Sequence, residues 1–182
     1  VILNQNAIMD DIKAKEKEAL LNTSANLGQI YSSLGKNDSA LHYYNLALTT
    51  SHETNDGFGI ANSLVNMAIL YTKLKQYDKA TDFSLRGSKL CVTNGFTDMY
   101  VYSLSNLGTI NRALKKYDVA ENYFQQAVNI AKKINSKILI RESYLSLASL
   151  YEEQQDFKKS YDYYKLYSET KDSLLNQENS KL

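Results

Sequence analysis

Proline is absent from this chain of 182 residues, and glycine occurs only 7 times. Proline interrupts helices and glycine marks tight turns, so their scarcity favours long helices joined by short loops. The single cysteine, Cys91, excludes an internal disulfide and a cysteine-based zinc cluster. Apolar residues form no run long enough to cross a bilayer, which takes about 20. We therefore expect no direct insertion into a membrane.

A surplus of either charge is also lacking. Lysine and arginine number 21 and aspartate and glutamate 20, which leaves a net charge of +1. Nucleic-acid binding requires a basic surface, and stacking on single strands requires that surface beside exposed aromatic rings. The 15 tyrosines therefore do not indicate a nucleic-acid partner, and we expect none. With 43% hydrophobic and 23% charged residues, the composition is typical of a globular chain.

The strongest pattern is an internal repeat with a period of 40 residues. A short box recurs four times without slippage, as Asn26-Leu27-Gly28, Asn66-Met67-Ala68, Asn106-Leu107-Gly108 and Ser146-Leu147-Ala148. A tyrosine follows the box in three of the four units, as Tyr31, Tyr71 and Tyr151. The repeat therefore extends beyond the box.

Apolar residues within each unit recur at helical spacing, which predicts two helices per repeat. We expect first helices near 16–34, 58–75, 98–115 and 138–154, and second helices near 38–54, 78–94, 118–134 and 157–175. An aspartate stands near the start of each second helix, as Asp38, Asp78, Asp118 and Asp156. We expect these four side chains to cap the helix N-termini.

The same period divides the chain into units. Residues 1–15 match the end of a preceding repeat, because Ala7 aligns with Ala47. Whole repeats are expected at 16–55, 56–95, 96–135 and 136–175. Together these segments make a repeat domain over 1–175, and 176–182 are expected to begin a C-terminal helical linker.

Residue types decide between the known families of helical repeat. A period of 40 also suits HEAT or armadillo repeats, which run about 40 to 47 residues, whereas the standard tetratricopeptide unit has 34. The order of large, small and aromatic residues nevertheless matches the tetratricopeptide pattern, with Leu27, Gly28, Tyr31, Ala40, Tyr44 and Ala47 in the first unit and Leu107, Gly108, Ala120, Phe124 and Ala127 in the third. The chain resembles a long variety of this family. The resemblance implies an all-α, right-handed superhelix of antiparallel helix pairs.

Long repeats with an Asn-Leu-Gly box are similar to those of kinesin light chain, polarity adaptors and peptide-sensing bacterial regulators. The stretch 167–181 resembles the junction after the last repeat in bacterial sensor histidine kinases and helix-turn-helix regulators. The resemblance implies an input or scaffolding region of a bacterial signalling protein. Because the chain begins at Val1, inside a unit, we expect it to be part of a longer protein. No signal peptide is expected, and the compartment stays open between cytoplasm and periplasm.

No group of side chains is spaced for catalysis or for metal binding. His42 and His52 lie ten residues apart on one expected helix, about three turns, and face different directions. Gly57-Phe58-Gly59 lacks the spacing of a phosphate-binding loop. We therefore expect no enzyme activity, no metal and no cofactor, and we assign Cys91 a packing role.

An asparagine recurs at one position of three first helices, as Asn26, Asn66 and Asn106. The resemblance implies that first helices line a concave groove, where amides would bind the main chain of an extended protein or peptide. Other groove positions would supply specificity: Asn22, Gln29, Asn62, Lys73, Tyr102, Thr109 and Arg112. The alternative interpretation is structural, with each amide bonded to a neighbouring helix so that it holds the repeat spacing. The sequence leaves both interpretations open.

Two basic residues, Lys73 and Arg112, make the middle of this groove basic, which predicts a ligand with an acidic segment there. Repeats that clamp the carboxylate of chaperone tails need a basic residue where Ala25 stands, so a co-chaperone role is not expected. The alternative function is a spacer or dimerisation element that self-associates and binds no peptide.

Overall fold

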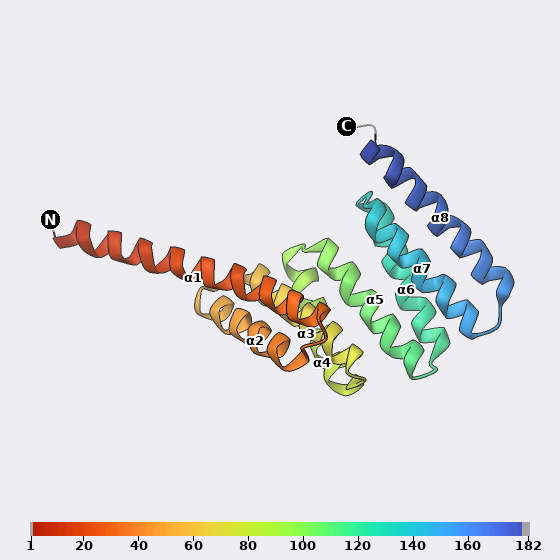
Figure 1. The fold of residues 1–182 in the computed structure, drawn as a ribbon, viewed down its shortest axis with the longest axis horizontal. Helices are drawn as coiled ribbons and strands as arrows, with labels where there is room; N and C mark the ends of the chain where they lie inside the picture. Colours follow the sequence, from red (N-terminus) through yellow and green to blue (C-terminus); the bar gives the residue numbers. More distant parts are fainter. Residues whose placement is uncertain (1, 180–182) are drawn as a thin grey trace.

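The computed structural model describes the backbone of residues 2–179 and the side chains of residues 9–176. Eight helices follow one another: α1 (Ile2–Ser33), α2 (Asn37–Glu53), α3 (Gly57–Lys73), α4 (Tyr77–Asn94), α5 (Thr97–Ala113), α6 (Tyr117–Lys133), α7 (Lys137–Glu153) and α8 (Phe157–Asn179). Each helix packs against its neighbours along the chain, and the pairs form an elongated array with α1 and α8 at opposite ends (Figure 1). The expected all-α solenoid of antiparallel helix pairs is confirmed.

Every connection between helices is closed by the same turn. One residue in each connection has a left-handed backbone, namely Gly35, Asn55, Lys75, Gly95, Lys115, Asn135 and Gln155. The amide of the next residue donates to the carbonyl five residues back, as Lys36 N does to Tyr31 O at 2.9 Å. This is the Schellman arrangement, which satisfies carbonyls at the end of a helix. Because the turns recur every 20 residues, first and second helices have nearly equal lengths.

Helices α2 to α7 begin and end within two residues of the expected positions, but α1 differs. It was expected near 16–34 and instead runs unbroken from Ile2 to Ser33. The other junctions between repeats carry Asn or Gly at the left-handed position, whereas residues 13–19 are lysines, glutamates and alanines, which are strong helix formers. No turn forms there, so the described part of 1–15 continues α1. Residues 176–179 likewise continue α8, and 180–182 lie outside the described residues.

The predicted aspartate caps are wrong at three of four positions. The N-cap residues of α2, α4 and α6 are Lys36, Gln76 and Lys116, and none of them forms a capping side-chain bond. Asp38 and its counterparts Asp78 and Asp118 lie in the first turn instead. There the negative carboxylate stabilises the helix, because the N-terminal end of the helix dipole is positive. Asp156 does cap α8, because its Oδ1 accepts from Lys159 N at 3.1 Å.

Aromatic rings lie directly over glycines in two of the repeats. Tyr44 on α2 covers Gly28 on α1, and Phe124 on α6 covers Gly108 on α5, so closely that a Cβ on either glycine would overlap the ring. Both rings are buried, and Tyr44 also packs against Leu70 on the first helix of the next repeat. A single ring therefore holds together the two helices of its own repeat and the helix that follows.

The other two repeats carry different pairs at these positions. In the second repeat Ala68 takes the place of glycine and Ser84 the place of the ring, and both are buried. In the fourth repeat Ala148 is combined with an aromatic residue, Tyr164, which is 55% exposed. A ring cannot approach an alanine as closely as a glycine. Tyr164 also lies on α8, which contacts only α7, so no described helix covers its ring from the other side and it stays largely in solvent.

Stacked rings join the two helices of three repeats. The pairs are Tyr31–Tyr43 at 5.3 Å, Tyr71–Phe83 at 5.3 Å and Tyr151–Tyr163 at 5.6 Å between ring centroids. The third repeat has Asn111 at this position, and its Nδ2 donates to Leu107 O at 2.8 Å. The tyrosine pattern of the sequence therefore marks contacts within repeats.

Gly108→Ala is expected to destabilise the fold by about 1–3 kcal/mol, because the added methyl overlaps the Phe124 ring. Urea denaturation followed by circular dichroism measures the change. In a Phe124→Ser background, which copies Ser84 of the second repeat, the same substitution should cost nothing. An equal cost in both backgrounds would show that the ring contact is not the cause.

Candidate functional site

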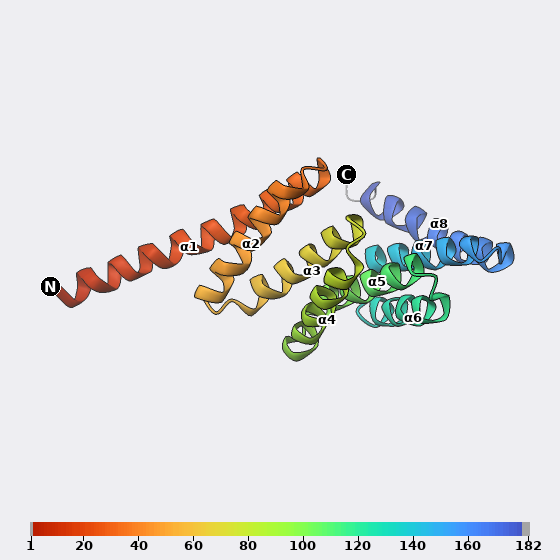
Figure 2. The same cartoon turned by 90° about the horizontal axis from the view of Figure 1, so that it is seen from below.

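The first helices form the inner face of the array. Across repeats, α3 contacts α1 and α5, and α5 contacts α7. Over the part of the chain that the structure describes, no two of the second helices α2, α4, α6 and α8 are in contact. An array whose first helices approach each other more closely curves with those helices inside, and Figure 2 shows successive pairs rotated along it. The helices expected to line a groove are therefore on the concave side.

All ten predicted groove residues lie on first helices, but their exposure differs. Asn22, Asn26, Gln29, Lys73 and Tyr102 are exposed, Asn62, Asn66, Thr109 and Arg112 are half-buried, and Asn106 is buried. A ligand could reach nine of them without rearrangement of the fold.

The three repeated asparagines occupy three different environments. Asn26 has no side-chain hydrogen bond to any other described residue. Asn66 donates to Asn62 Oδ1 on the same helix at 3.0 Å. Asn106 donates to Ser84 Oγ at 2.9 Å and is only 7% exposed. The structural interpretation therefore holds for Asn106, which ties α5 to α4.

The residue that faces each asparagine accounts for the difference. Asn106 reaches a small hydroxyl on the preceding second helix, Ser84. The preceding second helix of Asn66 carries Tyr44 at the position equivalent to Ser84, which offers no small hydroxyl, and Asn66 donates to Asn62 instead. The other repeats carry an aromatic residue where Ser84 stands. This exception is visible in the sequence and distinguishes Asn106 from the other two asparagines.

The basic character expected in the middle of the groove is reduced by ion pairing. Arg112 Nε lies 3.5 Å from Glu153 Oε1 on α7. The negative charge of this carboxylate offsets the positive charge of the guanidinium. Lys73 is exposed, and its Nζ donates to Ser32 Oγ on α1 at 3.3 Å. Of the two cations, only Lys73 is therefore left without a carboxylate partner among the described residues.

Tyr102, in the third repeat, lies near two carboxylates. Partial burial and the nearby carboxylates of Asp98 and Glu142 raise the pKa of its phenol. Glu142 itself accepts from Arg141 Nη2 at 2.6 Å. The phenol is therefore protonated at neutral pH and can donate a hydrogen bond to a ligand.

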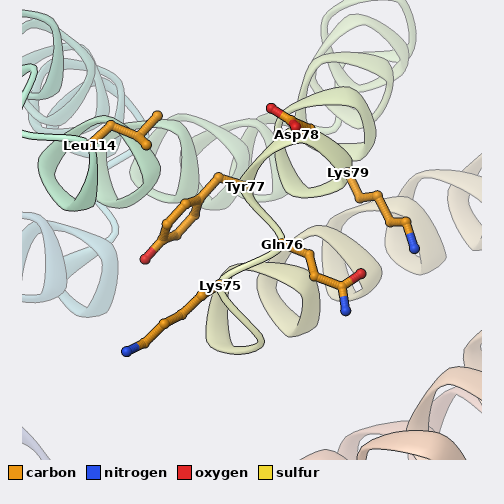
Figure 3. A pocket seen from close by; sticks show the side chains of 6 residues that line it. All are labelled: Lys75, Gln76, Tyr77, Asp78, Lys79 and Leu114. Atoms are coloured by element: carbon orange, nitrogen blue, oxygen red, sulfur yellow. The ribbon is translucent and has the colours of Figure 1, made fainter.

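A hollow of about 480 Å³ lies at the turn between α3 and α4 (Figure 3). Lys75, Gln76, Tyr77, Asp78 and Lys79 line it, together with Leu114 at the end of α5. None of the ten predicted groove residues belongs to it. Similar hollows occur at the equivalent turns after α1 and α5, so this feature follows from the repeat.

Within the described residues, no group of three or more His, Cys, Asp or Glu side chains is placed to hold a metal ion. No described helix combines the length and apolarity that crossing a membrane requires. Cys91 is buried in the contact between α3 and α4, beside Ala61 and Val65.

The tetratricopeptide repeat pattern matches residues 16–91, 59–133 and 99–171, which together cover most of the chain. The chain belongs to the tetratricopeptide repeat family. The family resemblance inferred from the sequence is thereby confirmed. No curated protein sequence matches this tetratricopeptide protein.

Several solved structures share the fold. Aspartyl phosphate phosphatase F from Bacillus subtilis is 15% identical, with a TM-score of 0.77 and coverage of 88% of this chain and 41% of that one. A Rap protein complexed with competence and sporulation factor is 17% identical, with a TM-score of 0.75 and coverage of 82% and 43%. A signal transduction ATPase with a tetratricopeptide repeat sensor from Pyrococcus horikoshii is 18% identical, with a TM-score of 0.70 and coverage of 87% and 25%. This chain spans less than half the length of each.

Asn106→Ala is expected to destabilise the fold by about 1–3 kcal/mol, because Ser84 Oγ loses its partner in a buried site. Asn26→Ala should change stability by less than about 0.5 kcal/mol, since that side chain is exposed. Urea denaturation of both variants makes the comparison. Equal stability of the two variants would contradict the structural role of Asn106.

Cys91 is expected to react slowly with thiol reagents in the folded protein. Burial raises the pKa of its thiol from 9.0 to about 11, which lowers the thiolate fraction near pH 8 by about 100-fold. Labelling with a chromogenic disulfide should therefore be at least about 100-fold slower in buffer than in denaturant. Equal rates would mean that α3 and α4 do not shield the thiol.

Proposed function

We propose that this tetratricopeptide module binds an extended segment of a protein or peptide along the inner face of its first helices, and that it is not an enzyme. One observation carries the proposal. Five amide side chains gather on α1 and α3: Asn22, Asn26, Gln29, Asn62 and Asn66. Within the described residues, the only side-chain hydrogen bond they make is the one from Asn66 to Asn62.

Unbonded amides suit an extended ligand. A peptide in extended form offers a donor and an acceptor at every residue, and a side-chain amide can satisfy both whatever the sequence of the ligand. Ordering the peptide consumes part of this interaction. Affinity for a single peptide should therefore be about micromolar, or roughly 8 kcal/mol.

The groups that would select a sequence lie beside these amides. Lys73 is exposed, and its ammonium group would form an ion pair with an acidic side chain of the ligand near the second repeat. Tyr102 and Thr109 offer hydroxyls in the third repeat, although Thr109 Oγ1 already donates to Ser105 O at 2.9 Å. Arg112 is paired with Glu153 and would contribute less charge. The proposed acidic segment therefore belongs beside Lys73.

Structures with the same fold support a role in signalling. The Rap protein is complexed with competence and sporulation factor, and the Pyrococcus horikoshii protein is a signal transduction ATPase with a tetratricopeptide repeat sensor. We propose that this chain is the input or scaffolding region of a bacterial signal-transduction protein. One similar structure is a phosphatase, but the chain spans only 41% of it, and we assign no such activity here.

Selection from a displayed random-peptide library tests the proposal. The baits are the parent, an Asn26→Ala, Asn66→Ala variant, and an Asn45→Ala, Asn129→Ala control that removes two exposed amides from second helices. All three baits are first compared by circular dichroism. Peptides should enrich on the parent and the control and be lost from the Asn26→Ala, Asn66→Ala variant, with binding weakened at least about tenfold.

Two outcomes would overturn the proposal. Equal enrichment on all three baits would mean that the inner amides do not bind the ligand. Enrichment on none of them would favour the alternative function, a spacer or self-associating element without a peptide ligand.

A further inference from the structure

The two ends of the array expose positions that its interior buries. Ile30 on α1 is 54% exposed. The residues at the same position of the other repeats, Leu70, Ile110 and Leu150, are at most 1% exposed. Leu70 packs against Tyr44 and Leu150 against Phe124, each on the second helix of the preceding repeat. The outer face of α1 therefore carries one half of an interface between repeats.

The far end carries the other half. Tyr164 on α8 is 55% exposed, whereas the residues at its position in the other repeats, Tyr44, Ser84 and Phe124, are at most 3% exposed. Phe157 and Tyr161 on the same face are 67% and 69% exposed. With Ala148 of α7 they line a hollow of about 340 Å³. An exposed aromatic surface of this kind marks an interaction site.

We propose that the α8 end of one copy binds the α1 end of a second copy, head to tail. The interior provides the template, because Tyr44 packs against Met67 and Leu70 across one repeat boundary. Tyr164 is the counterpart of Tyr44, and Leu27 and Ile30 are the counterparts of Met67 and Leu70. If the two copies meet as neighbouring repeats do, Tyr164 of one copy packs against Leu27 and Ile30 of the other. The proposed contact therefore continues the interface that joins α2 to α3 and α6 to α7.

The lengths of the two end helices fit this arrangement. α8 has 23 residues and α1 has 32, whereas α2 and α3 have 17 each. In the antiparallel register of the interior, Leu174 and Leu175 fall beside Leu20 of the second copy, which is itself 43% exposed. The helical extensions therefore lengthen the proposed contact and add apolar residues to it.

Within the described residues, these two surfaces do not meet each other. In the described structure α1 and α8 make no contact, and they lie at opposite ends of the array (Figure 1). The two surfaces are different, so the pairing is heterologous and each copy keeps one free end. The proposal does not rest on peptide binding, because its test uses no peptide. In the register of the interior, where Asn106 meets Ser84, Asn26 falls beside Tyr164 of the other copy, so the contact covers that amide and leaves Asn62 and Asn66 open.

Sedimentation velocity tests the proposal with the full chain from about 1 to 200 μM, a range that covers micromolar affinity. The parent should show a mass that rises with concentration. Ile30→Glu removes only the α1 surface and Tyr164→Glu only the α8 surface, so each variant alone should be monomeric. Leu85→Glu, at a residue on α4 that is 50% exposed, is the control and should behave as the parent.

The decisive sample is an equal mixture of the two end variants. Each retains the surface that the other lacks, so the mixture should form a one-to-one complex of twice the monomer mass. Circular dichroism first establishes that both variants are folded. A parent that stays monomeric throughout would overturn the proposal, and so would an Ile30→Glu variant that still dimerises alone, since that pairing joins two identical surfaces.

Discussion

The left-handed turn that closes a helix every 20 residues is the constraint on which the architecture depends. Because each turn has the same hydrogen bonds, the interior helices have nearly equal lengths and meet their neighbours in the same register. Each repeat boundary is therefore built on equivalent positions, with a residue of the second helix set between two first helices. The inner face, the buried asparagine and the open ends all follow from this regularity.

The sequence predicted the period, the number of helices in each repeat and the family, because apolar spacing and the recurring box depend on local residue types. It located each turn between the expected helices to within two residues, but it did not predict which residue of the turn has the left-handed backbone. Only Gly35 and Gly95 carry glycine at the left-handed position, while Lys75, Lys115 and Gln155 have no residue-type signal. The expected aspartate caps are wrong for α2, α4 and α6, because each of these helices begins directly after its turn, one residue before the expected position, whereas α8 begins where expected and is capped by Asp156.

The sequence predicts where the candidate site residues lie on the helices, but not which side chains surround them. A period places Asn26, Asn66 and Asn106 on the same face of equivalent helices, and the structure agrees. What each amide can do depends on the side chain opposite, which comes from another helix about 22 residues away in the sequence. Arg112 is a similar case, because its carboxylate partner belongs to the next repeat. Long-range partners of this kind are not visible in local spacing.

Among the described residues, no contact joins repeats that are not neighbours, which has a mechanical consequence. A small rotation at one repeat boundary meets no resistance from distant parts of the array, and rotations at successive boundaries add up. The direction of each repeat relative to the next is therefore set by the contacts at their shared boundary alone. A change of curvature imposed at one end would be transmitted to the other as a change in the direction of the terminal helix.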